Sequence, residues 1–198
     1  MRNFIFILCA CSFFVSCSHS PQKNYFYLTP LLNAEVNAEK STEANNANIT
    51  QVIGIGPIEI ADYLTRSQII DSQTDNKLNL AENAYWAEPL DKSIAQVIAL
   101  NLTQANSSRS FVSFPWRTDA KPRYSVRLSV ANLSRSDNKA TINSTWELVN
   151  NDTKTNVVRR NFLRTITTSS GAKSLAQSYS QLLSELSAEI DAELNKVQ

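Results

Sequence analysis

Three stretches in which apolar and polar residues alternate, followed by one long amphipathic stretch, constrain the fold of this chain most. Alternation runs through residues 124–130 and 140–148, and a less regular version follows over 158–166. A repeat of two residues predicts strands that bury one face. Large apolar residues then recur every three or four positions from Leu175 to Val197, which predicts a helix of about 25 residues.

The first half of the chain predicts further strands and turns. β-forming residues gather in several short runs, and Gly56-Pro57 predicts a bend in one of them. A turn or single helical turn is expected over residues 61–66, and hairpin loops over 71–76 and 132–139. Residues 33–48 are rich in Asn, Ala, Glu, Ser and Thr and predict an exposed loop. The strands are expected over residues 25–28, 51–60, 68–70, 77–80 and 110–114.

A second helix is expected after Pro89. Asp91 is well placed in its first turn, and the helix ends near residues 105–108. Its predicted apolar face consists of Ile94, Val97, Ile98, Leu100 and Leu102. The fold class is therefore α+β: one antiparallel-rich sheet with two helices on one face, without an internal repeat or a second domain.

Scarce residue types exclude several kinds of chemistry. The only histidine is His19, and the cysteines are Cys9, Cys11 and Cys17, so residues 20–198 contain neither type. Residues 20–198 therefore cannot form a His/Cys zinc site, a catalytic site in which a nucleophile pairs with His, or a disulfide framework. The formal net charge of +1 also argues against a nucleic-acid partner.

Two weaker patterns do not change this conclusion. Gly54 and Gly56 begin like a dinucleotide-binding motif, but Glu59 stands at its third glycine position, so a strand bend is the better interpretation. Acidic residues in the same half have neither the spacing nor an orienting partner for hydrolysis. We therefore expect no enzyme activity, no cofactor and no metal. The acidic residues considered are Glu59, Asp62, Glu82 and Glu88.

The amino end has the pattern of a targeting segment. Arg2 precedes a charge-free run over residues 4–15, which is about a dozen residues and shorter than the roughly 20 that span a bilayer. Small residues then precede Cys17, as in a bacterial lipobox, although Phe14 replaces the usual Leu. Cys11 follows a better-matching Leu8, but cleavage there would leave only ten residues of signal. We favour Cys17 as the lipidated residue.

Lipidation would decide where the protein resides. Two or three acyl chains give stable membrane anchoring where one chain does not. Ser18 follows Cys17, whereas an Asp at that position retains such lipoproteins at the inner membrane, so the outer membrane is expected. A competing interpretation is a eukaryotic secreted glycoprotein, because Asn-X-Ser/Thr occurs at six positions. These are Asn48, Asn101, Asn106, Asn132, Asn143 and Asn151.

Several motifs together resemble those of a known family. Residues 53–69 are similar to the "V-GPV-LP-YLDRPQIV" stretch of ABC-type transport auxiliary lipoproteins, which include the paraquat-inducible protein C (PqiC/YmbA-like) lipoproteins. Residues 86–90 match their "WAEPL", residues 114–116 resemble their "-PW" element, and residues 27–29 resemble their "YYTL" opening. Ser67, where the family usually has Pro, and the Asn-rich stretch at 33–48 depart from the pattern.

The resemblance implies both a fold and a function. It implies a TolB-N-like α/β sandwich over residues 24–198, preceded by a lipoprotein signal peptide at 1–16 and a lipidated tether at 17–23. It also implies a non-catalytic component of a system that moves lipids or other hydrophobic compounds between two membranes. The implied partners are a tunnel-forming MCE-domain protein of the inner membrane (PqiB-like) and, in many systems, an ABC ATPase and permease. A ring of identical subunits that caps the end of the partner's tunnel is compatible with this role.

Aromatic and arginine side chains in turns are the expected docking residues for that partner. Such residues often dominate binding surfaces, although they are also common in cores. The alternative function is a structural or assembly lipoprotein of the envelope without a role in transport. The expected partner-binding residues are Tyr63, Arg66, Tyr85, Trp86 and Trp116, with the remainder of the loop at residues 62–67.

Overall fold

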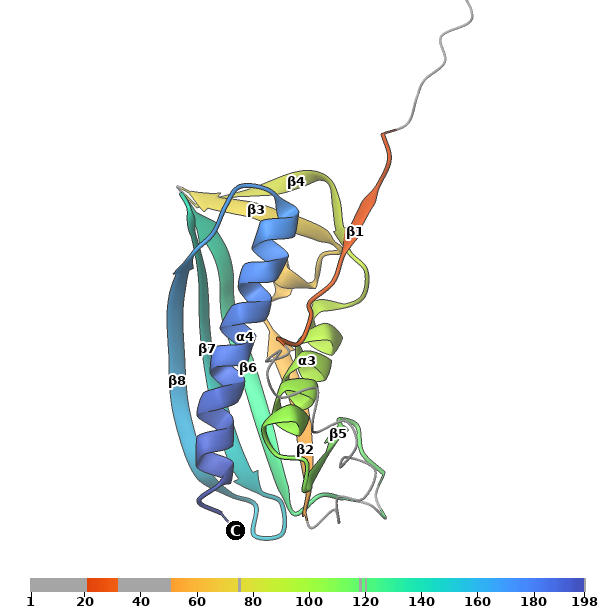
Figure 1. Ribbon diagram of the computed structural model, residues 1–198, viewed down its shortest axis with the longest axis vertical. Coiled ribbons are helices and arrows are strands. Elements are labelled where there is room, and N and C mark those ends of the chain that lie inside the picture. Colours follow the sequence, from red (N-terminus) through yellow and green to blue (C-terminus); the bar gives the residue numbers. More distant parts are fainter. Residues whose placement is uncertain (1–20, 32–50, 75, 118, 120, 198) are drawn as a thin grey trace, which may run out of the picture.

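The computed structural model describes residues 21–31, 51–74, 76–117, 119 and 121–197. The predicted signal peptide, Cys17 and the expected loop at 33–48 lie outside these residues. The described part folds into two sheets and two α-helices (Figure 1), which confirms the α+β prediction. The elements are β1 (Asn24–Phe26), β2 (Gln51–Ile60), the 3-10 helix η3 (Asp62–Thr65), β3 (Gln68–Thr74), β4 (Lys77–Trp86), α3 (Leu90–Ala105), β5 (Arg109–Ser113), β6 (Tyr124–Ser136), β7 (Lys139–Asn150), β8 (Thr155–Thr167) and α4 (Ala172–Leu194).

The larger sheet has five strands in the order β5-β2-β6-β7-β8. The three strands predicted from alternation form its antiparallel half, β6-β7-β8. β2 pairs in parallel with both β5 and β6. A separate three-stranded sheet, β1-β4-β3, was not predicted, because alternation reports which face of a strand is buried and not which strand lies beside it.

Both helices cover the same face of the five-stranded sheet (Figure 1), as predicted. α4 contacts β7 and β8, α3 contacts β2 and β5, and the helices contact each other. The predicted apolar face of the C-terminal helix is buried from Leu175 to Leu194, whereas Val197, its last predicted member, follows the end of α4 and is only partly buried. On the sheet, the even-numbered residues from Ala140 to Leu148 are all buried. The buried face of the strand and the buried face of α4 therefore belong to one hydrophobic core.

The apolar face of α3 differs from the prediction at one position. Leu102 is fully buried, but Leu100 is 40% exposed, so its inclusion in the buried face was wrong. Asn101 takes a buried position instead and donates a hydrogen bond to Oγ of Ser187 on α4 (3.3 Å). A pure apolarity pattern misses such a position, because a buried amide is stabilised by a partner from a distant part of the chain.

The hairpin loops are shorter than predicted. β3 and β4 continue to Thr74 and Lys77, and β6 and β7 continue to Ser136 and Lys139. The tips hold Asn76 and Asp137 at positive φ (60° and 52°), the conformation that tight hairpin turns need. The backbones of polar residues form strand hydrogen bonds as well as those of apolar residues do. The strands therefore extend beyond the segments in which apolar and polar residues alternate.

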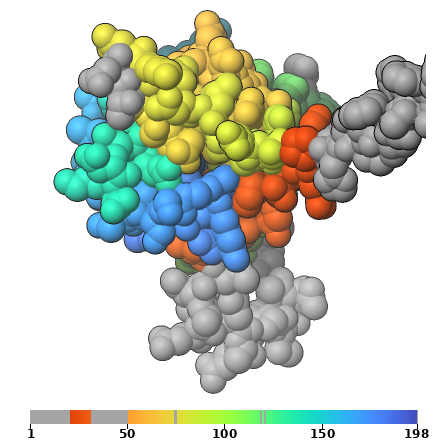
Figure 2. Space-filling view, turned by 90° about the horizontal axis from the view of Figure 1, so that it is seen from above, coloured from red at the N-terminus to blue at the C-terminus, as the bar shows by residue number. Residues whose placement is uncertain are grey.

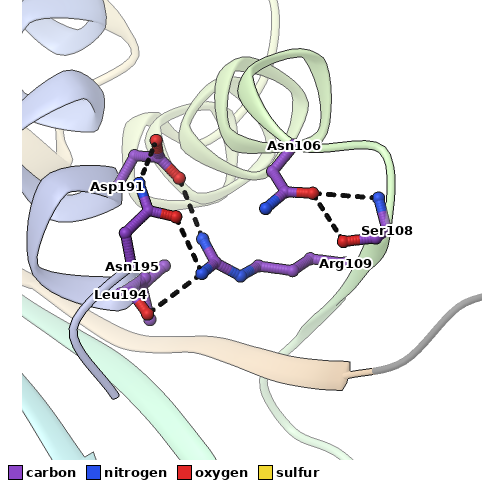
Figure 3. Close-up of polar contacts among 6 residues, drawn as sticks. All are labelled: Asn106, Ser108, Arg109, Asp191, Leu194 and Asn195. Atoms are coloured by element: carbon purple, nitrogen blue, oxygen red, sulfur yellow. Dashed lines mark hydrogen bonds and ion pairs between the residues drawn. The ribbon is translucent and has the colours of Figure 1, made fainter. Parts of the chain in front are cut away.

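Buried arginines tie distant elements together. The Arg109 guanidinium donates to Oδ1 of Asp191, the main-chain oxygen of Leu194 and Oδ1 of Asn195, each at 3.0 Å (Figure 3). A cation at this place satisfies free carbonyl groups and opposes the negative end of the α4 dipole. Arg135 likewise donates to the main-chain and side-chain oxygens of Asp71 (2.9 and 2.6 Å), which joins β6 to β3.

Two leucines in α3 provide a matched test of the core. Leu102→Ala should lower the free energy of unfolding by about 2–5 kcal/mol, because it opens a cavity at a fully buried site. Leu100→Ala, at the exposed site two residues earlier, should change it by less than about 0.5 kcal/mol. Urea denaturation followed by circular dichroism measures both, and equal losses would contradict the assigned helix face.

The arginine contact at the end of α4 has its own control. Arg109→Leu should cost roughly 3 kcal/mol of unfolding free energy, because the Asp191 carboxylate loses its buried partner. Arg117→Ala, which breaks the exposed ion pair with Asp119, should leave the midpoint of urea unfolding almost unchanged, because solvent screens this pair. If both variants unfold at the same urea concentration, Arg109 does not hold the helix end.

Candidate functional site

The structure separates the five predicted docking residues into four environments. Trp86 lies in the core, and Tyr63 and Arg66 lie in the turn that follows β2. Tyr85 lies beside the amino end of the described chain, and Trp116 lies against Gly54 of β2. Proximity in sequence placed Tyr85 and Trp86 together, but the pleat of β4 points their side chains to opposite faces.

Trp86 is a core residue. Its ring is 8% exposed and lies 6.4 Å, centroid to centroid, from the ring of Tyr179 on α4. Burial raises the pKa of the Tyr179 phenol well above its usual value, as expected for a hydroxyl group far from water. The Trp86 ring therefore joins the small sheet to α4 and does not present itself to a partner on the surface.

The turn after β2 is held by side-chain hydrogen bonds. The Tyr63 hydroxyl donates to Oδ1 of Asn132 on β6 (2.7 Å), and the Thr65 hydroxyl donates to the Asp62 carbonyl (2.6 Å). Tyr63 is half-buried, so it positions the turn. Arg66 ends the turn with an exposed side chain, and none of the described ion pairs involves it. Of the two, Arg66 is the side chain available for binding.

Trp116 covers a glycine in β2. A Cβ atom placed on Gly54 would lie 2.8 Å from the Trp116 ring and 2.7 Å from the Pro122 ring, so only glycine allows this contact. The Phe114 ring meets Trp116 edge to face, with centroids 5.1 Å apart, and remains 46% exposed. Phe114 was not among the predicted site residues, although it belongs to the same Phe-Pro-Trp sequence.

A groove opens beside this aromatic pair. β5 pairs with β2 only as far as Ile55, opposite Ser113, while β2 continues to Ile60. The bend at Gly56-Pro57 has φ of 114° at Gly56 and a register shift toward β6, which confirms the predicted strand bend. The space between this bend, the first half of α3 and the end of β5 has a volume of about 420 Å³. Its rim includes Phe114, Asp91 and Lys92.

The four acidic residues considered for hydrolysis are all exposed, and no hydrogen bond in the described part joins them. No group of three or more potential metal ligands occurs in the described ranges. Within those same ranges, no helix combines the length and apolarity needed to cross a bilayer. Asn101 and Asn151 are buried and hydrogen-bonded, so neither is open to glycosylation in this fold.

The comparisons with known proteins agree with the fold. The family model for the ABC-type transport auxiliary lipoprotein component matches residues 31–191. A crystal structure described as an uncharacterized protein has a TM-score of 0.68 at 20% identity, with 88% of this chain and 99% of that chain covered. Protein XCC0632 from Xanthomonas campestris has a TM-score of 0.60 at 15% identity, with 85% and 92% covered. No curated protein matches the sequence.

Proposed function

Because this chain belongs to the family of ABC-type transport auxiliary lipoprotein components, we propose that it is a lipid-anchored, non-catalytic adapter of an intermembrane lipid-transport system. The observation that carries this proposal is the extent of the family match, which covers every described strand except β1, all of α3 and most of α4. The fold is compatible with it as well, because Trp86 packs in the core, Trp116 covers Gly54 and Tyr63 holds a turn by a hydrogen bond.

The anchor in this proposal is Cys17. Residues 1–16 act as the signal peptide, acyl chains on Cys17 enter the membrane, and residues 17–23 form the tether of the domain at 24–198. Ser18 directs the lipoprotein to the inner leaflet of the outer membrane. The folded body then lies in the periplasm, where it can meet a partner that extends from the inner membrane.

The partner is an MCE-domain protein of the inner membrane, and an ABC ATPase and permease supply the energy. We assign its docking surface to the β5 edge, which is defined here by Phe114, Trp116 and the groove beside them. An exposed aromatic ring over a groove with a charged rim has the composition of a binding hot spot. In Figure 1, β5 lies at the end of the molecule opposite the outgoing amino-terminal strand, so the anchored protein would present it away from the membrane. Arg66 is a second candidate contact.

Two charge substitutions test the β5 edge and the second candidate contact at Arg66. Phe114→Glu and Arg66→Glu should each reduce co-purification with the MCE partner at least about tenfold, which corresponds to roughly 1.4 kcal/mol of binding free energy. Leu163→Glu is the matched control, because Leu163 is an exposed apolar residue of β8 outside this surface. Circular dichroism checks that all three variants fold.

Retention of the partner by Phe114→Glu would remove the β5 edge from the proposal, and retention by Arg66→Glu would remove Arg66. Loss of the partner in the Leu163→Glu control would show that any added charge disturbs the complex. An intact complex in every variant, together with normal lipid transport in a strain that lacks this protein, would favour a purely structural role in the envelope.

A further inference from the structure

Exposed aromatic side chains gather where the chain leaves the folded body toward its amino end. Tyr25 and Tyr27 are 61% and 64% exposed, whereas Phe26 packs against the core and Leu28 is 4% exposed. The alternation points both tyrosines away from the core on the same side of the segment. Single exposed apolar residues are normal on a protein surface, whereas exposed rings that gather in one place indicate an interaction site.

Two more residues complete this group. The Tyr85 ring on β4 lies 5.9 Å from the Tyr25 ring, and the Lys23 ammonium lies 5.4 Å from the centre of the Tyr85 ring. The strands hold this arrangement, because β1 pairs with β4 in parallel and places Tyr25 opposite Tyr85. We call Lys23, Tyr25, Tyr27 and Tyr85 the amino-end aromatic face. Figure 2 views the molecule from this end, with the amino-terminal segment (red) against β4 (yellow-green).

The distance along the chain to the proposed anchor is short. Six peptide units separate Lys23 from Cys17, and they span at most about 20 Å when fully extended. The amino-end aromatic face therefore stays close to the membrane surface for as long as the acyl chains are inserted. A surface so restricted meets lipid headgroups at a high local concentration.

The chemistry of the face matches that surface. Tyrosine has an apolar ring and a polar hydroxyl group, and it is enriched at the boundary between headgroups and acyl chains. A lysine beside it is attracted to anionic headgroups. A segment made only of polar residues at this place would have no preference for the boundary between headgroups and acyl chains.

We propose that the amino-end aromatic face rests in the headgroup layer of the membrane that holds Cys17, and thereby orients the body. This inference depends on the proposed function for the anchor and goes beyond it, because an anchor alone leaves the body free to tumble. With this contact the β5 edge points away from the bilayer, and the partner meets it in one orientation.

Site-directed spin labelling of the full-length, lipidated chain tests the inference. Residues 18–198 contain no cysteine, so Tyr27→Cys and Leu163→Cys each introduce a single free thiol for a nitroxide label. Each protein is reconstituted on vesicles of phosphatidylethanolamine and phosphatidylglycerol. Collisions of the label with oxygen, which concentrates in lipid, are then compared with collisions with a water-soluble nickel chelate.

The label at position 27 should lose most of its nickel-chelate collisions on the vesicles, and the label at position 163 should keep them. Adding Tyr25→Ser and Tyr85→Ser to the Tyr27→Cys protein should return position 27 to water. Equal nickel-chelate access at both positions on vesicle-bound protein would overturn the inference while leaving the anchor intact. Protection of position 27 only after the MCE partner is added would overturn it too, since the face would then bind protein.

A failure of the anchor itself gives a different result. If the full-length chain does not float with the vesicles in a density gradient, the proposed lipidation fails and the membrane contact fails with it. Flotation without protection at position 27 removes only the contact.

Discussion

The apolar face of α4 is the constraint on which the rest of the structure depends. A helix of 23 residues with a continuous row of leucines cannot remain exposed in water, and β7, β8 and α3 provide the surface that covers it. Polar contacts then fix its position along the sheet: Arg109 holds its last turn, Trp146 donates to Glu189 (3.0 Å), and Ser180 accepts from the Thr29 main-chain nitrogen (3.0 Å). The last of these contacts also seats the amino-terminal segment, so the same helix that completes the core determines where the tether leaves the body.

Sequence periodicity predicted the parts of the fold in which one face is apolar. The strands at 124–130 and 140–148 and the final helix needed no knowledge of their neighbours, because burial alone imposes their repeats. The parallel pairing of β2, the small sheet and the Arg135–Asp71 contact could not be predicted in this way, since each depends on a partner tens of residues away. Leu100 and Asn101 illustrate the same limit within one helix: their exchange of roles depends on Ser187 in α4.

The candidate site was less predictable than the fold, because an aromatic residue type does not reveal whether its ring is buried. Trp86 stands beside Tyr85 in the sequence, yet one ring packs on Tyr179 and the other on Tyr25. The Trp116 ring packs over Gly54, so the exposed aromatic ring in this region is that of Phe114, which was not predicted. The result is a body with two distinct ends: the amino-end aromatic face, and the grooved β5 edge that we propose as the docking surface. A physical division of this kind suits an adapter between a membrane and a transport protein.

The proposed function requires that the amino end be fixed in a membrane, and the most direct measurement is mass spectrometry of the mature protein purified from native membranes. The proposed account predicts a chain that begins at Cys17 and carries a diacylglyceryl group on its sulfur, recovered from the outer-membrane fraction. A chain that begins elsewhere, or one with an unmodified Cys17 recovered from the soluble periplasm, would contradict it.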